Sequence, residues 1–215
     1  MQEETINKKI DAFINSFTAL GPLSNTENLY DSNNKEGMQR AHNVKLYLRL
    51  IAQQKPDTLL IGEAPGYQGT TRTGIPFCSE FIMEKNMPEA SFFNNAQGFR
   101  RVFDDTKIFK EPTSTIMWRT LSQYKKLPLL WAVFPHHPYI GNNLLSNRTP
   151  TTHEVKILEH LLIDFLSIFE VKQVLSVGNT AKNTLDSIGI SSIKIRHPSH
   201  GGANIFAKQL FEAMS

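Results

Sequence analysis

Cysteine is almost absent from this sequence of 215 residues, since Cys78 is the only one. A single thiol cannot form a disulfide within the chain, and it cannot supply the four cysteines of a structural zinc site or an iron–sulfur cluster. Hydrophobic runs are short, and none approaches the roughly 20 residues of a membrane-spanning helix. The polar start, MQEETINKKI, lacks the apolar core of a signal peptide. We therefore expect no cofactor, no membrane association and a cytoplasmic location.

Several catalytic motifs are missing as well. The sequence contains neither the Walker spacing with Gly-Lys-Ser/Thr nor G-x-G-x-x-G, which argues against a nucleoside-triphosphate site. The H-E-x-x-H pattern of zinc helices and the G-x-S-x-G turn of serine hydrolases are also absent. Four histidines remain as conceivable metal ligands, at positions 136, 137, 197 and 200. Two of them are adjacent, and neighbouring residues of a strand point to opposite faces, so we expect no metal site.

The composition is that of a folded protein. Hydrophobic residues make up 40% and charged residues 20%, which excludes disorder of the whole chain. The length fits one domain, and we expect residues 1–215 to form it, with residues 1–37 as an N-terminal helix and loop extension. The net charge of +3 is compatible with a polyanionic partner without requiring one.

The apolar pattern predicts strands that alternate with helices. Short apolar runs typical of buried parallel strands occupy residues 58–62, 129–134, 174–177 and 193–195. Helical spacing covers residues 6–17, 41–51, 155–169, 180–188 and 203–214, and we expect further helices around 92–103 and 116–124. This alternation favours an α/β fold: a three-layer α/β/α sandwich with a central four-stranded, mostly parallel sheet.

Local signals mark two helix ends. Thr151 and Glu154 form a capping box, which predicts a helix start at this point. Gly189 is the expected C-cap of the helix before it.

Distinctive loops follow three of the expected strands. They are residues 62–80, 134–150 and 196–204, and the first contains four glycines and no helical period. The carboxyl ends of parallel strands lie at one edge of the sheet, where ligands bind in such folds. Glycine lets the backbone approach a ligand closely. We therefore expect the functional site among these loops.

Three segments in these loops resemble the uracil-DNA glycosylase superfamily. They are GEAPG at 62–66, TGIPF at 73–77 and HPS at 197–199, and the resemblance extends over roughly residues 40–210. GEAPG is most similar to the family that carries an iron–sulfur cluster. The following segment, as far as Glu80, is more similar to a family with a relaxed substrate range, which has its catalytic Asp 18 positions after the first glycine, as Glu80 is from Gly62.

The resemblance implies hydrolysis of the N-glycosidic bond of uracil in DNA, with the nucleotide extruded from the stack and no metal or redox cofactor. Donors must stabilise the negative charge on the departing uracil, and His197 is suited to this together with the backbone amides of residues 62–66. Phe77 aligns with the aromatic residue that stacks on uracil. The substrate-binding residues that we expect are Gly62, Ala64, Gly66, Tyr67, Phe77 and Asn147.

The catalytic carboxylate has two candidates. Glu63 occupies the position of an acid implicated in catalysis in the iron–sulfur-bearing family, and Glu80 matches the acid of the relaxed family. Ala64 stands where the best-known branch has a water-activating Asp. We favour Glu80, because a charge at Glu63 lies next to the amides that receive the uracil anion. A structural role is the alternative for each: Glu80 at a helix N-terminus, Glu63 as a brace of the loop.

Two departures concern cofactor and base recognition. Both sister families hold a four-iron cluster through four cysteines, so we expect no cluster here. Ala132 stands where the strict uracil enzymes have an Asn that reads the pyrimidine edge, which puts strict uracil specificity in doubt. Asn147 is a possible substitute.

A third departure concerns the DNA duplex. The best-known branch follows HPS with Pro and a bulky Leu that wedges into the duplex, whereas this chain has His200, Gly201 and Gly202. Either Ile205 supplies the wedge or it is missing, and we then expect weak activity on duplex DNA or a preference for single strands.

The expected partner is DNA, bound by a monomer. The candidate DNA-contacting residues are Arg72, Arg148, Arg196, Ser199 and His200. No lysine stands in the motifs to form a Schiff base, so we expect a monofunctional hydrolase without lyase activity. The alternatives are a catalytically inactive DNA- or nucleotide-binding protein with the same fold, and a hydrolase of free nucleosides.

Overall fold

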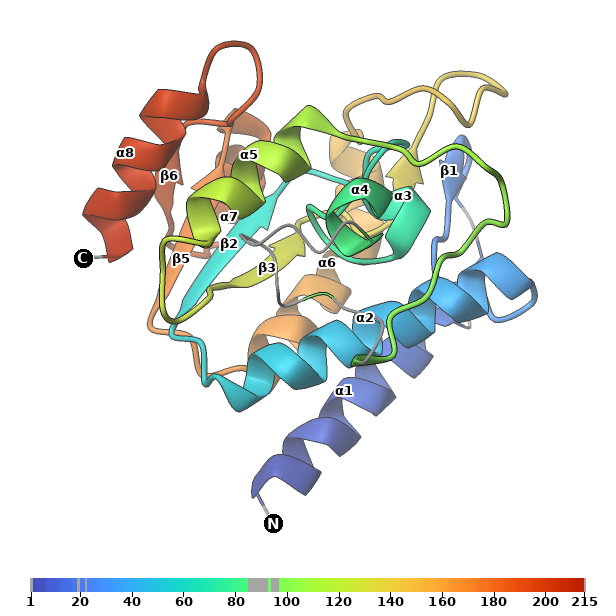
Figure 1. The fold of residues 1–215 in the computed structure, drawn as a ribbon, viewed down its shortest axis with the longest axis horizontal. Helices are drawn as coiled ribbons and strands as arrows, with labels where there is room; N and C mark the ends of the chain where they lie inside the picture. Colours follow the sequence, from blue (N-terminus) through green and yellow to red (C-terminus); the bar gives the residue numbers. More distant parts are fainter. Residues whose placement is uncertain (1, 19, 22, 85–92, 94–96, 215) are drawn as a thin grey trace.

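Four parallel strands form the centre of the structure, a computed structural model that describes residues 2–18, 20–21, 23–84, 93 and 97–214. The strands lie in the order β3 (Leu129–Ala132), β2 (Thr58–Gly62), β5 (Gln173–Val177) and β6 (Ile193–Ile195), as Figure 1 shows. The chain leaves β2 toward β3 and later returns to β5 on the other side. The strand order therefore reverses between β2 and β5, and ligands bind at such a reversal in parallel sheets.

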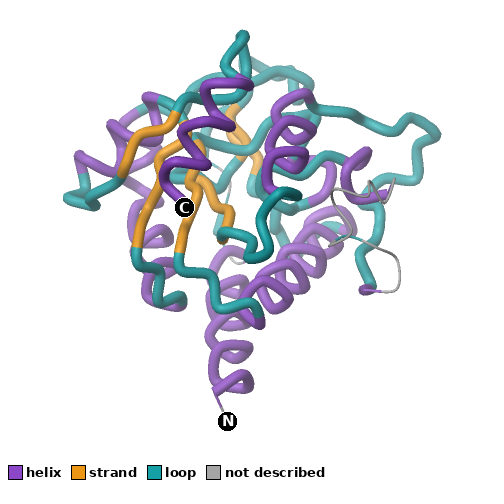
Figure 2. Tube along the Cα trace, turned by 60° about the vertical axis from the view of Figure 1, so that its left-hand side comes forward, coloured by secondary structure: helices purple, strands orange, loops and turns teal. Residues whose placement is uncertain are grey.

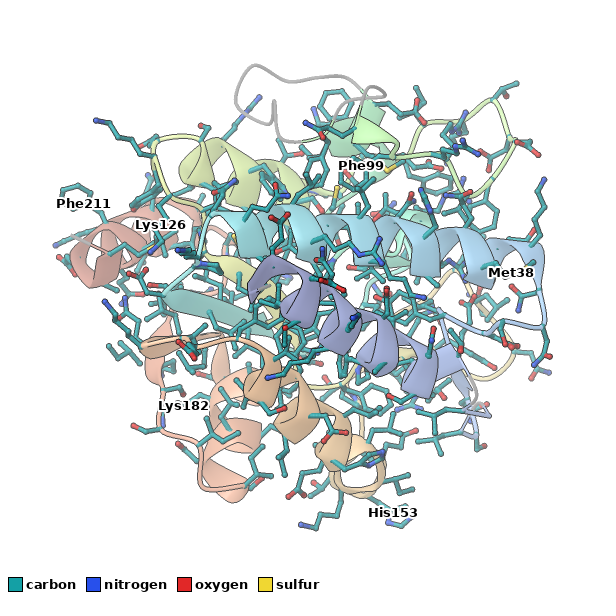
Figure 3. All side chains as sticks on the ribbon, turned by 90° about the horizontal axis from the view of Figure 1, so that it is seen from below. Met38, Phe99, Lys126, His153, Lys182 and Phe211 are labelled. Atoms are coloured by element: carbon teal, nitrogen blue, oxygen red, sulfur yellow. The ribbon has the colours of Figure 1, made fainter. Side chains whose placement is uncertain are left out.

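Helices cover both faces of the sheet, which makes the expected three-layer sandwich. In Figure 3, α6 (Thr152–Ile168) and α7 (Asn179–Ser187) lie on one side, near the labels His153 and Lys182. On the other side lie α5 (Pro112–Leu121) and α8 (Ala203–Met214). Strand β2 is buried along its whole length and β3 nearly so, because these two layers enclose them, which agrees with their continuous apolar runs. The edge strand β6 is exposed at Ile193 and Lys194.

The N-terminal segment is part of the core. Two aromatic residues of α1 (Gln2–Thr18), Phe13 and Phe17, pack against Trp131 of β3. In α2 (Lys35–Gln53), the Tyr47 hydroxyl accepts a hydrogen bond of 2.8 Å from the backbone N–H of Leu130, so α2 covers the free edge of β3. Figure 2 shows the start of α1 extending away from the rest of the chain. The loop expected before α2 includes β1 (Thr26–Glu27), which pairs with β4 (His137–Pro138).

Several local predictions are confirmed. Thr151 and Glu154 form the capping box of α6 through both of its hydrogen bonds. Gly189 follows α7 with φ +76, a left-handed conformation that costs glycine little. The loop after β2 differs from expectation, since it contains two short helices, α3 (Thr70–Thr73) and α4 (Glu80–Glu84).

Of the two helices expected within residues 84–126, the second is present with shifted bounds. Of the helix expected at 92–103, residues 92 and 94–96 lie outside the described residues, and residues 99–103 are irregular. The helix expected at 116–124 is α5, which begins at Pro112 because proline fits the first turn, where its missing N–H costs nothing. Within the described residues, no helix is long and apolar enough to cross a membrane.

Candidate active site

A cavity of about 480 Å³ opens at the carboxyl ends of β2 and β3. The loops predicted to converge there do so, since residues 62–66, 147–149 and 197–200 share its wall. The wall residues are Tyr30, Gly62, Glu63, Ala64, Pro65, Gly66, Thr70, Pro76, Phe77, Glu111, Thr113, Trp131, Ala132, Pro135, Asn147, Arg148, Thr149, His197, Ser199 and His200. A space of this size accommodates a nucleobase with its sugar.

An aromatic ring lies against the backbone at the end of β2. A Cβ at Gly62 would overlap the ring of Phe77, so only glycine leaves the room that this ring occupies. Phe77 has φ +54, a strained conformation for a residue with a side chain. The indole N–H of Trp118 donates to the Phe77 carbonyl at 3.1 Å and holds it there. The strain thus serves to present the ring to the cavity.

The loop with four glycines, residues 62–80 (the glycine loop), is joined to the loop after β4 by the side-chain amide of Asn147. Asn147 Oδ1 accepts a hydrogen bond of 2.9 Å from the backbone N–H of Tyr67. Because Oδ1 is engaged, the orientation of the Asn147 side chain is fixed, and its NH₂ group lies near Gly66, 3.6 Å from the place of a Cβ. Tyr67 itself is not among the wall residues, so its contribution is this backbone contact rather than the pocket contact expected of its side chain.

The hydrogen bonds of His197 indicate which of its ring nitrogens carries the proton. The backbone N–H of Ser199 donates to its Nδ1 at 3.2 Å, and Ser199 Oγ lies 2.7 Å from the same nitrogen. Burial lowers the pKa of His197, and the charge of Glu63 opposes that effect only in part. A neutral ring whose Nδ1 accepts a hydrogen bond carries its proton on Nε2. His197 is therefore a neutral N–H donor in the cavity wall.

The two candidate carboxylates lie in different environments. Glu63 is half-buried in the cavity wall and close enough to His197 to act on its charge. Glu80 is 0% exposed and lies outside the wall. Its carboxylate accepts hydrogen bonds of 2.9 Å from Arg72 Nη2 and from the backbone N–H of Phe109. This environment does not support Glu80 as the catalytic carboxylate, because its oxygens are bound within the protein.

The structure also does not support contact with DNA, the role expected of Arg72. Its guanidinium lies between the rings of Phe103 and Phe109, 3.9 and 4.4 Å from their centroids. It also pairs with Asp105 at 2.7 Å and with Glu80. At 9% exposure it cannot reach a DNA phosphate, so we withdraw it from the DNA-contacting residues.

The remaining DNA-contact candidates divide into two groups. Arg148 lines the cavity, but both of its terminal nitrogens bind Glu154, and this pairing lowers the pKa of Glu154 to about 2. Arg148 therefore holds the loop rather than a phosphate. Arg196 and His200 are exposed and Ser199 is half-buried, which leaves these three at the rim.

Sequence reasoning missed one charged residue of the wall, Glu111. It is the N-cap residue of α5 and lies in the segment where no clear periodicity was visible. A usable signal was present, since Glu111 stands directly before Pro112, and proline is favoured at the first position of a helix.

The residues present do not fit a metal or a cluster. Cys78 is buried and free, and a four-cysteine cluster cannot be built from the one cysteine of the chain. Within the described part of the chain, no group of three or more His, Cys, Asp or Glu residues is arranged to hold a metal ion. His136 and His137 are buried outside the cavity wall, away from His197 and His200 within it.

Comparison with known proteins gives one family. The family model described as "Uracil DNA glycosylase superfamily" matches residues 50–213. That range contains the whole four-stranded sheet and every wall residue except Tyr30. A search of curated proteins gives no match.

Proposed function

The chain belongs to the uracil-DNA glycosylase superfamily, and on this premise we propose that it hydrolyses the N-glycosidic bond of uracil, and of other deaminated bases, in DNA. The observation that carries the proposal is the convergence of a stacking ring, a neutral N–H donor and a carboxylate on one cavity, from Phe77, His197 and Glu63. These are the three functions that removal of an extruded base requires.

We assign to His197 the stabilisation of the leaving base. Bond cleavage places negative charge on uracil O2, and a fixed donor at that position stabilises the transition state more than the ground state. The Nε2–H of His197 fits this role, because the bonds from Ser199 to Nδ1 orient the ring before substrate binds. Glu63, Ala64 and Gly66 lie in the same wall, and their backbone N–H groups add further donors, whereas Pro65 has none.

Glu63 replaces Glu80 as the catalytic carboxylate in this proposal. The reaction develops positive charge on the sugar, which a carboxylate stabilises or which an oriented water attacks. Glu63 lies in the wall beside His197, so its carboxylate acts on the sugar side while His197 acts on the base. Glu80 then has the structural role weighed from the sequence, at the N-terminus of α4, and its buried carboxylate also pairs with Arg72.

Base recognition falls to Phe77 and Asn147. Stacking of a base on an aromatic ring contributes about 1–3 kcal/mol. The oriented NH₂ group of Asn147 can donate to the edge of the base, while Ala132 at the end of β3 offers no side-chain hydrogen bond. No lysine is among the described wall residues, which supports a monofunctional hydrolase without a Schiff-base intermediate.

DNA approaches the rim formed by Arg196, Ser199 and His200. Gly201 and Gly202 follow with no bulky side chain, and Ile205 is 52% exposed on the first turn of α8. We propose that the protein acts as a monomer and prefers single strands, since Gly201 and Gly202 offer no wedge that would open a duplex; Ile205 is the alternative wedge. We also propose that residues 1–215 act as one domain with residues 1–37 as its extension.

The test uses oligonucleotides that contain one uracil, single-stranded and duplex, followed by alkali treatment and a denaturing gel. Strand scission supports the enzyme, and His197→Ala protein prepared in the same way controls for glycosylase from the expression host. A mobility shift without scission supports the inactive DNA-binding alternative. Cleavage of free deoxyuridine without either result supports a nucleoside hydrolase.

A further inference from the structure

Glu111 is a carboxyl group in the cavity wall that the chemistry above does not use. It stands at the start of α5, and its Oε2 accepts a hydrogen bond from the hydroxyl of the fully buried Ser114. Among the described residues, no lysine or arginine forms an ion pair with it. A carboxyl group placed in a binding cavity without a cationic partner marks a functional candidate.

The carboxyl group lies directly against the glycine loop. A Cβ at Gly69 would overlap it, and a Cβ at Gly66 would lie 3.0 Å from its Oε1. The NH₂ group of Asn147 lies 3.6 Å from that same point at Gly66. Glu111 Oε1 and the oriented Asn147 amide therefore meet at one part of the wall, which the two glycines keep open.

The surroundings of Glu111 favour its neutral form. Burial raises the pKa of Glu111, and the hydrogen bond from Ser114 offsets this only in part. The Cys78 thiol beside it has a pKa well above its usual value and stays neutral, so it brings no charge. The other ionisable groups of the wall are Tyr30, Glu63, Arg148, His197 and His200, and the charge of Arg148 is engaged by Glu154.

The position of the proton follows from the hydrogen bond. With Oε2 accepting from the Ser114 hydroxyl, Oε1, the oxygen nearer Gly66 and Asn147, is the one that can carry the proton of the neutral acid. A buried carboxylic acid that keeps its proton can act as a hydrogen-bond donor at neutral pH. It cannot donate once it ionises.

We propose that Glu111, as a neutral carboxylic acid, donates from Oε1 to a keto oxygen of the extruded base and so selects deaminated bases. Deamination replaces the exocyclic amino group of cytosine, adenine or guanine with a keto oxygen. A keto oxygen accepts a hydrogen bond where the amino group of the parent base is a donor. Glu111 thereby performs the discrimination that Ala132 cannot. This inference rests on the proposed function, because it assumes that a base occupies the cavity.

The test separates recognition from cleavage by measuring both. Single-stranded oligonucleotides carry either a non-hydrolysable 2′-fluorinated deoxyuridine or the matching deoxycytidine analogue, and their affinities are measured by fluorescence anisotropy between pH 5 and 9. Excision of uracil is measured in parallel under single-turnover conditions. The variants are Glu111→Gln, which keeps a donor but cannot ionise, and Glu111→Ala. Glu170→Gln, on an exposed residue outside the wall, is the matched control. Thermal melts confirm that each is folded.

We expect the parent protein to prefer uracil over cytosine and to lose that preference as pH rises and Glu111 ionises. Glu111→Gln should keep the preference for uracil at every pH. In Glu111→Ala the ratio of the uracil affinity to the cytosine affinity should fall by about tenfold to a hundredfold. The inference is overturned if Glu111→Ala keeps the parent preference, or if Glu111→Gln shows the same pH dependence as the parent. If the parent binds as expected but excises no base, the proposed function fails and the inference stands. If the parent excises uracil while Glu111→Ala prefers uracil over cytosine as strongly as the parent does, the inference fails and the proposed function stands.

Discussion

Replacing Glu80 by Gln should destabilise the protein and leave its chemistry nearly intact. Glu80 is fully buried, and its charge is balanced by Arg72, which is itself 9% exposed, and by Arg101 at 3.6 Å. Removing one partner of a buried ion pair costs about 3–5 kcal/mol, because the other charge stays behind without compensation. Arg72 retains Asp105 as a second partner at 2.7 Å, so we expect a cost of about 2–3 kcal/mol. For a chain of this size that lowers the melting temperature by roughly 5–10 °C.

Glu63→Gln should have the opposite profile. Glu63 lies in the cavity wall and, among the described residues, forms no ion pair with Lys or Arg like that of Glu80 with Arg72; glutamine also preserves its shape. We expect a melting temperature close to that of the parent. A carboxylate that orients water or stabilises the sugar cation contributes about 10²- to 10⁴-fold to the rate, so uracil excision should fall by that factor.

The assay compares both variants by calorimetry and by single-turnover excision from a single-stranded oligonucleotide. Single-turnover rates report the chemical step, so they distinguish a damaged active site from a smaller folded fraction. The assignment is refuted if Glu80→Gln loses more activity per folded molecule than Glu63→Gln. In that case the carboxylate of Glu80 must leave Arg72 during the reaction.

Three further predictions follow from the wall, the rim and the core. His197→Ala should lower excision by about 10²- to 10³-fold in a folded protein, and equal single-turnover rates would remove the donor role. Because Arg72 and Arg148 are engaged and Ser199 carries no charge, we expect only about one to two phosphates to be neutralised at the rim, and a slope of log affinity against log salt near −1 for single strands; Arg196→Gln should flatten that slope, and a slope steeper than about −2 in the parent contradicts our exclusion of the two arginines. Burial lowers the pKa of His136 to about 4, whereas the unfolded chain protonates near its ordinary value of 6.5, so stability should fall by about 2–3 kcal/mol between pH 6.5 and 4.5. Urea unfolding should show a smaller loss in His136→Gln, and an unchanged loss refutes the reasoning.

The sheet could be predicted because its signals are local. Residues 58–62 and 173–177 are short apolar runs bounded by proline or glycine, and burial on both faces demands that pattern. The start of α6 was equally visible, because Thr151 and Glu154 satisfy each other within one turn. The sequence signals of such elements lie within a few residues, and tertiary contacts do not change the secondary structure that they predict.

The environment of Glu80 could not be predicted in the same way. Its partners are Arg72, eight residues earlier, and the backbone of Phe109, 29 residues later. The segment that supplies Phe103, Asp105 and Phe109 is irregular, so no periodicity indicates which way it faces. A match in spacing places Glu80 correctly along the chain but says nothing about what neutralises its charge. That depends on a fold of the intervening loop that sequence spacing does not encode.

The ion pair between Glu80 and Arg72 also supports the shape of the cavity, although the Glu80 carboxylate does not face it. Arg72 lies on α3 and Glu80 begins α4, so their ion pair fixes the two short helices on either side of Phe77. Phe77 needs such support because its backbone is held in a left-handed conformation against Gly62. A charge placed there stabilises the wall of the pocket instead of the sugar. The proposed function therefore assigns the chemistry to groups that face the cavity, and Glu63 is the acid that directly follows β2 into its wall.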